Sequence, residues 1–260
     1  MVLKVGGNAF SGWTSVIVEK SMGQMAGSFG LATTDTFPGE ARKWDIAMGD
    51  ECIVEINGQK IITGHVEDIL IDYDTETHNI QFGGRDKTGD LVDCSFDGTI
   101  KEWKGLSVKQ VIEKLCEPFD IEVVVDNSVS TVANVVWPGN MKANEGDTVF
   151  DLVLKICQTK AILPISYGDG KLTLTQAGKD YQAYDNLVSG VNILKGGLDQ
   201  SDKDRFRTYI VKGQGVGGDS LSSLFDFTGP AGRATDNIIG RYRPIILFTE
   251  TPTDKGRCLE

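Results

Sequence analysis

The chain has 260 residues, of which 40% are hydrophobic and 24% charged, the balance of a folded protein rather than a disordered one. Its net charge is -11, and residues 1–100 contain 16 acidic but only 7 basic side chains. Affinity for a phosphate backbone comes from Lys and Arg, so this charge argues against sequence-specific nucleic-acid binding. No stretch approaches the 18 consecutive apolar residues of a membrane-spanning helix, so we expect no membrane insertion.

Glycine is enriched and proline is not, with 31 and 7 residues respectively, which favours a mainly β protein with many tight turns. The cysteines are odd in number and far apart, which is typical of free thiols in a chain made in a reducing cytosol. They are Cys52, Cys94, Cys116, Cys157 and Cys258. The first residues contain no continuous apolar segment, so we expect no signal peptide.

Residues 1–100 are expected to form a β-barrel-like domain of short strands. The clearest signal is Asn57-Gly58 between two apolar runs, because a type I′ hairpin turn needs positive φ at both central residues. A second hairpin is predicted after it, with a polar tip from Asp74 to Thr77. The predicted strands cover residues 14–19, 28–33, 51–56, 59–63, 66–73 and 78–82.

Residues 101–182 contain an internal repeat that predicts a small α+β domain. Residues 105–116 align without gaps on residues 146–157, and apolar residues recur at helical spacing in both copies. Each copy begins with a capping-box pattern, Ser107 with Gln110 and Thr148 with Asp151. Strands are predicted after the helices, at residues 121–125, 161–166 and 171–175. Cys116 and Cys157 occupy equivalent apolar positions, so we expect both to be buried.

Residues 183–260 are expected to form a second β-barrel-like domain. Strands are predicted at residues 188–194, 209–212 and 244–249, and a long Gly- and Ser-containing loop follows Gly213. So few strands cannot close a core alone. We therefore expect the domain to be incomplete at its C-terminus, or to complete itself against another domain or subunit.

The sequence contains no motif that points to catalysis, a cofactor or a metal. His65 and His78 are the only histidines, and both lie on predicted strands without metal-ligand spacing. Residues 213–218 match G-x-G-x-x-G, with Asp236 further on, but no crossover helix can follow, so a flexible loop is the better interpretation. We predict no catalytic, cofactor-binding or metal-binding residues and no enzymatic activity.

Two other segments have ordinary structural interpretations. Asp72, Asp74 and Glu76 alternate like the start of a calcium loop, but the sixth position is Thr77, so a hairpin tip is favoured. Residues 83–88 contain Lys-Thr without the spacing of a phosphate-binding loop. A bulged or sharply turning strand end, with Gly where φ is positive, is predicted there. The four tryptophans are scattered and are expected in the core or in interfaces: Trp13, Trp44, Trp103 and Trp137.

Several motifs, in order along nearly the whole chain, resemble the baseplate hub (tail) proteins of Mu-like contractile-tailed phages, within the late control D-like hub superfamily. The most specific runs from Gly84-Arg85-Asp86 to Asp93-Cys94-Ser95. The others are at residues 64–68, 105–108, 201–214 and 240–244.

The resemblance implies two β-barrel-like domains flanking a small α+β domain. It also implies a homotrimer whose barrels build a pseudo-sixfold ring, joining the sixfold tail tube and other baseplate proteins to the threefold central spike. The protein would then be a structural component of the virion baseplate, made in the bacterial host cytoplasm. Family members continue beyond the position of Glu260, so the resemblance implies a shortened chain with an incomplete second barrel.

Three alternatives stay open. The first is that the chain is a hub of a phage-derived injection machine such as a pyocin or type VI secretion apparatus. The second is a tail-associated cell-wall hydrolase, and the third is a carbohydrate-binding β module.

The charge of residues 1–100 adds a hypothesis within the hub interpretation. If the first barrel lines a channel for DNA, its acidic wall would repel phosphates and let the duplex slide.

Overall fold

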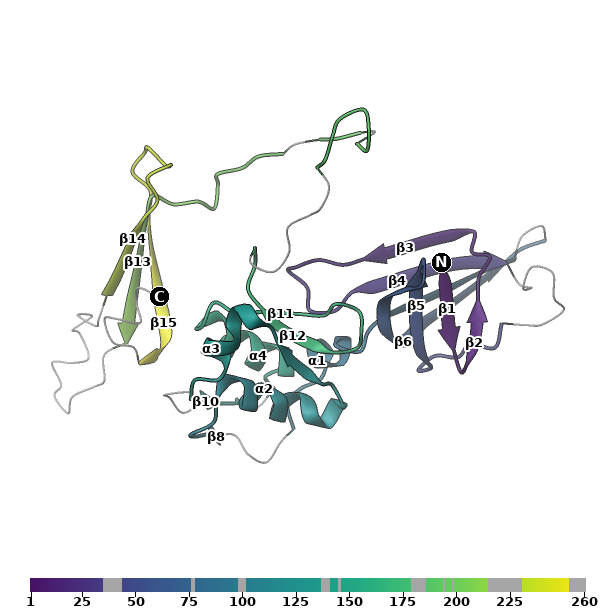
Figure 1. Cartoon of the computed structure of the whole chain (residues 1–260), viewed down its shortest axis with the longest axis horizontal. Helices are drawn as coiled ribbons and strands as arrows, with labels where there is room; N and C mark the ends of the chain where they lie inside the picture. Colours follow the sequence, from purple (N-terminus) through teal and green to yellow (C-terminus); the bar gives the residue numbers. More distant parts are fainter. Residues whose placement is uncertain are drawn as a thin grey trace. The chain divides into compact units, whose positions relative to one another are not determined.

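The computed structural model describes residues 1–34, 44–75, 78–97, 102–136, 141–144, 146–178, 186–193, 195–197, 199–214 and 231–252. The chain divides into two compact units, Met1–Gln182 and Ala183–Glu260. Figure 1 shows a sheet followed by a helical region in the first unit, and a small sheet in the second. The predicted class, mainly β with a small α+β region, is confirmed.

The first part of the first unit is a seven-stranded antiparallel sheet in the order β2-β1-β5-β6-β7-β4-β3. Its strands curl around one face (Figure 1). They are β1 (Val2–Val5), β2 (Asn8–Phe10), β3 (Ser15–Glu19), β4 (Ser28–Thr34), β5 (Glu51–Ile56), β6 (Gln59–Tyr73) and β7 (His78–Asp86).

Alternating apolar residues place one face of this sheet in a core. Side chains on β1, β4, β5, β6 and β7 meet there, among them Leu3, Leu31, Val54, Ile62 and Phe82. An aromatic cluster lies against this core, with the rings of Trp13 and Trp44 5.0 Å apart and both close to Phe82. The predicted packing role of these two tryptophans is confirmed, as it is for buried Trp103. Trp137 lies outside the described residues.

The Asn57-Gly58 hairpin is confirmed, with φ of 51° and 78° at its two central residues. The prediction of separate strands at 59–63 and 66–73 is wrong, because both belong to the continuous 15-residue strand β6. Gly64, which lies between the two predicted ranges, is paired with Asp86 on β7. A Cβ there would lie 1.9 Å from the carbonyl oxygen of Arg85. Gly64 therefore permits a close backbone approach and does not end the strand.

The helical region follows the sheet directly. Both predicted capping boxes are present, since the Ser107 and Thr148 side chains accept hydrogen bonds from the backbone N–H groups of Gln110 and Asp151. The helices and short strands are α1 (Gly89–Asp93), β8 (Glu102–Trp103), α2 (Val108–Cys116), η1 (Glu117–Phe119), β9 (Val123–Val125), η2 (Asn127–Val129), α3 (Ser130–Ala133), β10 (Met141–Lys142), α4 (Val149–Gln158), β11 (Leu163–Ile165) and β12 (Leu172–Thr175).

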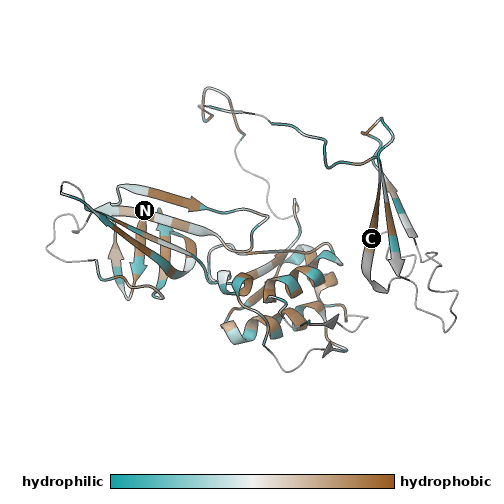
Figure 2. Cartoon of the chain, turned by 180° about the vertical axis from the view of Figure 1, so that it is seen from behind, coloured by the Kyte–Doolittle hydropathy of each residue, from teal (hydrophilic) through white to brown (hydrophobic). Residues whose placement is uncertain are grey.

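The repeat builds the core of this region. The apolar faces of α2 and α4 pack against a three-stranded sheet in the order β11-β12-β9, in which β12 and β9 run parallel. Figure 2 shows these helix faces in brown, the colour of hydrophobic residues. Cys116 and Cys157 are fully buried as predicted, and burial raises the pKa of both thiols to about 12. Both cysteines therefore act as small apolar side chains.

The second unit contains a three-stranded sheet in the order β14-β13-β15. Its strands are β13 (Thr208–Gln214), β14 (Ala231–Thr235) and β15 (Pro244–Pro252), so two of the predicted strands are confirmed. The strand predicted at 188–194 is wrong. Residues 188–193 form a turn closed by Asn192, whose side chain accepts a hydrogen bond from Val188 N at 2.7 Å. Leu194 lies outside the described residues, as do Gly215–Gly218 of the glycine motif.

Candidate functional site: a buried aspartate junction and an arginine cluster

The motif at residues 83–88 lies where β7 ends and α1 follows. Gly84 faces β6, and a Cβ there would lie 2.1 Å from the His65 carbonyl oxygen and 2.7 Å from the Phe29 ring. The predicted bulge is present at this place, but it lies on β6 between Val66 and Asp68. The prediction of positive φ at these glycines is wrong. Glycine is required at position 84 because a side chain would not fit there, and not because of its backbone conformation.

Asp86 is the buried polar centre of this junction. Its carboxylate accepts hydrogen bonds from Gly27 N at 2.9 Å and from Thr63 N at 3.3 Å. The Ser166 side chain, from the α+β region, also bonds to it. Burial raises the pKa of Asp86 above its usual value, while these hydrogen bonds and the positive charge of Lys20 oppose the shift. One carboxylate thus joins three separate segments of the first unit.

The β11–β12 turn fits closely against β6. Thr63 Oγ1 donates a hydrogen bond to the Gly168 carbonyl oxygen at 2.8 Å. Gly168 has a φ of +91°, and a Cβ there would lie 1.8 Å from the Ile61 carbonyl oxygen. Lys20 Nζ donates to the same Ile61 oxygen at 2.9 Å. The sheet and the α+β region therefore meet through directed backbone contacts as well as through Asp86.

The other residues of the motif bind further segments. Arg85 forms ion pairs with Asp93 on α1 and with Glu67 on β6, and these hydrogen bonds raise the pKa of its guanidinium above its usual value. Lys87 Nζ donates to the Asp120 carbonyl oxygen at 2.8 Å. Buried Thr88 donates through Oγ1 to the Met25 carbonyl oxygen at 3.0 Å. The motif is thus a structural junction.

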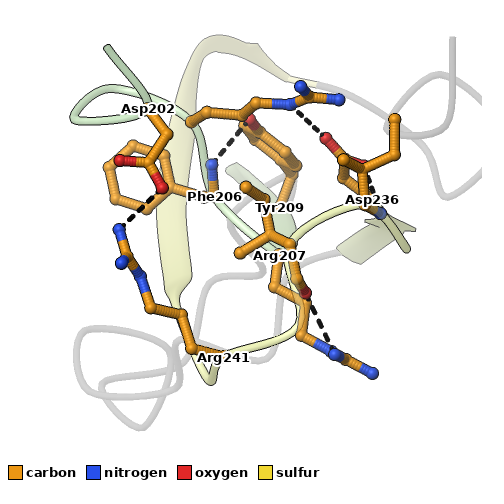
Figure 3. Close-up of polar contacts among 9 residues, drawn as sticks. Asp202, Phe206, Arg207, Tyr209, Asp236 and Arg241 are labelled. Atoms are coloured by element: carbon orange, nitrogen blue, oxygen red, sulfur yellow. Dashed lines mark hydrogen bonds and ion pairs between the residues drawn. The ribbon is translucent and has the colours of Figure 1, made fainter.

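A second polar cluster lies in the second unit, where the parallel strands β13 and β15 begin (Figure 3). Arg205 pairs with Asp236 at 2.6 Å, and Arg241 pairs with Asp202 at 2.8 Å. The pKa of Asp236 is lowered, first by the Ile238 backbone N–H and then by Arg205. These pairs tie the segment before β13 to the segment before β15.

The remaining arginines of this cluster bind backbone and an aromatic ring. Arg207 Nη1 donates to the Ile239 and Gly240 carbonyl oxygens at 3.0 and 2.9 Å. Arg243 lies 5.2 Å from the centre of the Phe206 ring, a cation–π contact, and donates to the Lys203 carbonyl oxygen. The cluster was not predicted from composition. The signal that could have revealed it is the repeated Arg-aromatic-Arg pattern at residues 205–207 and 241–243.

The residues considered for chemistry are not brought together. His65 lies on β6 and His78 on β7, where its ring packs 5.8 Å from that of Tyr73. Asp72 lies on β6 and Asp74 follows it, while Glu76 and Cys258 fall outside the described residues. Within the described ranges, no three His, Cys, Asp or Glu side chains gather to hold a metal ion. No helix in those ranges is long and apolar enough to cross a membrane.

A hollow of about 780 Å³ beside the β1–β2 turn is lined by polar side chains, among them Lys4, Asp50, His65 and Lys87. Several of these groups already have structural partners. Lys4 pairs with Glu55 at 2.8 Å, Asp50 accepts a hydrogen bond from Ala47 N at 2.7 Å, and Lys87 is bound to Asp120. The hollow therefore fits a structural role better than a reaction.

The polar groups of both clusters bind segments of the chain to one another, and the first cluster lies where a curled sheet meets a capped-helix repeat. Residues 1–86 match the family "Mu phage baseplate assembly protein GpP-like, N-terminal", and residues 88–176 match "Baseplate hub protein gp44-like, second domain". The baseplate hub protein gp44 of Escherichia phage Mu is 30% identical over 255 residues. That alignment covers 96% of this chain and 65% of gp44, so the chain spans less than two thirds of this curated relative.

Solved structures agree with these matches. The 43 kDa tail protein of prophage MuSo2 from Shewanella oneidensis is 30% identical, with a TM-score of 0.80 over 99% of this chain and 74% of that one. The tail protein from Neisseria meningitidis MC58, 21% identical, shares the fold with a TM-score of 0.76 over 99% of this chain and 72% of that one. The chain belongs to the family of Mu-like phage baseplate hub proteins, as the sequence motifs predicted.

Proposed function

We propose that the protein is a structural component of the virion, the baseplate hub of a contractile Mu-like prophage tail. In this role it forms a homotrimer that joins the sixfold tail tube to the threefold central spike, without catalysing a reaction. It is made in the cytoplasm of the bacterial host. The observation that carries the proposal is the 30% identity to the MuSo2 tail protein across 99% of the chain.

The distribution of polar and apolar groups supports an assembly role. Junction residues such as Asp86 and Arg85 are bound to the protein's own segments, so they hold these segments in fixed positions. In the described part of the second unit, Ile239 is the only hydrophobic side chain that is buried, although Ile238, Tyr242 and Phe248 are also present and are exposed. A small sheet with exposed apolar side chains is stabilised when another protein surface covers them.

The proposal includes a division into three domains. We propose boundaries after residues 100 and 182, giving a first barrel-like domain, an α+β domain and a second barrel-like domain. The seven-stranded sheet ends at Asp86 and the helical region begins with α1 at Gly89, so the change of structure lies before the proposed first boundary. The division of the chain into Met1–Gln182 and Ala183–Glu260 supports the second.

Native mass spectrometry of the purified full chain tests the trimer. We expect a dominant species of three times the 28.2 kDa chain mass, and a three-lobed ring in negative-stain images. A protein that stays monomeric at every concentration used would refute the trimer. Binding of this trimer to purified tail-tube and spike proteins of the same tail tests the joining role, and failure to bind either would refute that role.

A further inference from the structure

A hollow of about 490 Å³ lies beside helix α2, in the α+β region. Side chains of α2 line one side of it, and Ile121 and Val123, from the chain after the helix, line the other. Both of these apolar side chains belong to the buried core of the region, so the hollow reaches the edge of that core. Glu122 between them also lines the hollow and is paired with Lys171 at 2.7 Å. We name this hollow the α2–β9 groove.

Strand β9, which borders the groove at Val123, is an edge strand of its sheet. The order β11-β12-β9 places a strand on one side of β9 only, within the described part of the chain. The Glu122 carbonyl oxygen and the Asp126 N–H both bond to β12, at 2.9 Å. Because backbone groups alternate in direction along a strand, the N–H and C=O groups of Val123 and Val125 point to the open side. An open strand edge of this kind can accept an extended chain segment as a further strand.

The charges on the α2 side of the groove indicate which segment fits. Lys109 and Glu113 pair with each other at 3.3 Å. Lys114 and Glu117 also line the groove and are exposed, and among the described residues neither forms an ion pair. The groove therefore presents one unmatched positive charge and one unmatched negative charge. This combination favours a polypeptide that carries both signs over a polyanion such as nucleic acid.

The spacing of these two charges matches that of an extended segment. Lys114 and Glu117 are three residues apart on the helix, which separates their Cβ atoms by about 5–6 Å. Side chains on one face of a strand recur every two residues, a distance of about 7 Å. An acidic and a basic residue two positions apart in a bound segment can therefore face Lys114 and Glu117 together.

We propose that the α2–β9 groove binds an extended segment of another protein, which adds to the sheet as a strand beside β9. The segment carries an acidic and a basic residue two positions apart, and these face Lys114 and Glu117. Its backbone bonds to the free N–H and C=O groups of Val123 and Val125, and the charge pair selects the segment. The contact lies within the α+β region of a single copy, so it does not depend on the homotrimer proposed above.

The first test uses the peptide acetyl-Thr-Val-Glu-Val-Lys-Val-Thr-amide, added to the full chain. Its Glu and Lys are two positions apart, and its valines favour the extended conformation. We expect hydrogen exchange, followed by NMR, to slow about tenfold or more at the Val123 and Val125 amides, because both become hydrogen-bonded. The amides of Ser15–Glu19, on the edge strand β3 of the first sheet, are the control and should not change. A peptide that does not bind at up to about 1 mM, or that binds without slowing these two amides, would overturn the proposal.

Val125→Pro and Val125→Thr are a matched pair of variants for the strand edge. Proline removes the free N–H without breaking a bond to β12, while threonine keeps both the N–H and the β-branched shape. Circular dichroism should show folded protein in both cases. We expect the peptide dissociation constant to rise about tenfold or more for Val125→Pro and less than about threefold for Val125→Thr. Equal affinities for the two variants would overturn strand addition.

A charge exchange tests the α2 side of the groove. Lys114 is exposed, so Lys114→Glu should leave the fold intact and weaken peptide binding about threefold or more. A second peptide, with Lys in place of Glu, should recover most of this loss, because the exchanged charges attract again. A Lys114→Glu protein that binds both peptides equally would overturn the proposed charge pairing. Native mass spectrometry of the free chain measures the proposed trimer separately, so failure of the groove and failure of the hub proposal are distinguishable.

Discussion

Replacing Gly84 with Ala tests whether close backbone approach holds the junction at the end of β7. A Cβ at this position would lie 2.1 Å from the His65 carbonyl oxygen and 2.7 Å from two atoms of the Phe29 ring. The ring can turn, but the carbonyl belongs to β6, which pairs with β7 on both sides of this point. The two strands must therefore move apart to admit the methyl group.

The loss of unfolding free energy on Gly84→Ala depends on which atoms must move to admit the new methyl group. Overpacking a core with one extra methyl group typically costs about 1–3 kcal/mol. Because a backbone oxygen and not the end of a flexible side chain is in the way, we expect the upper end, about 3 kcal/mol. Movement at Gly84 would also disturb Asp86, two residues further on, whose carboxylate accepts hydrogen bonds from Gly27 and Thr63.

Gly30→Ala is the control for this change. Gly30 lies on β4 in the same sheet and also lacks a positive φ, but the nearest atom to its added Cβ is that of Ile17 at 4.0 Å. We expect this variant to be neutral or more stable by about 0.4–1 kcal/mol, because Ala restricts the unfolded chain.

Urea unfolding followed by tryptophan fluorescence measures both variants. All four tryptophans lie within Met1–Gln182, so the signal reports on the first unit. We expect a lower midpoint at unchanged slope for Gly84→Ala and no such loss for Gly30→Ala. Equal midpoints for the two variants would show that close approach at Gly84 does not hold the junction.

Three further predictions concern single polar groups. Burial raises the Asp86 pKa in the fold, so its contribution to stability is present below its unfolded value near 3.8 and is lost as pH rises through the folded value. Relative to Asp86→Asn, the wild type should therefore lose unfolding free energy as the pH rises above about 4, and a constant difference in urea titrations would contradict this. Ser107→Ala and Thr148→Ala should each cost about 1 kcal/mol in the same assay, because each opens a capping box; no loss in either would refute the capping role. Arg207→Ala should increase hydrogen exchange at residues 236–243 more than Arg205→Ala, because water screens the exposed ion pair of Arg205 with Asp236, and equal exchange would refute the distinction.

The sequence was sufficient to predict those turns and helix starts that are determined by residues close together in the chain. The Asn57-Gly58 turn is specified by the positive φ that both residues adopt, and the two helices begin at capping boxes whose partners lie three residues apart. The contacts within the arginine cluster of the second unit could not be predicted in this way. Arg205 and Asp236 are 31 residues apart in the sequence, and only the pairing of β13 with β14 and β15 brings them together.

Two of the wrong predictions share a physical cause. The break predicted between residues 63 and 66 and the positive φ predicted within residues 83–88 both fall at glycines, Gly64 and Gly84, that lie within paired strands in extended backbone. Glycine in a strand indicates either a special backbone angle or a nearby atom that excludes Cβ, and a single sequence does not distinguish them. In both positions the excluding atom is a carbonyl oxygen on the neighbouring strand, contributed by a residue about 20 positions away.

This explains why the most specific family motif contains charged residues: they hold other segments of the chain. Gly84 touches Phe29, Arg85 binds Asp93, Asp86 binds Gly27, Lys87 binds Asp120 and Thr88 binds Met25. Five consecutive residues thus contact three other segments, residues 25–29, α1 and the turn at Asp120, at the point where the sheet joins the helical region. A protein that must present its surfaces at fixed positions in an assembly depends on such a junction as strictly as an enzyme depends on its catalytic residues.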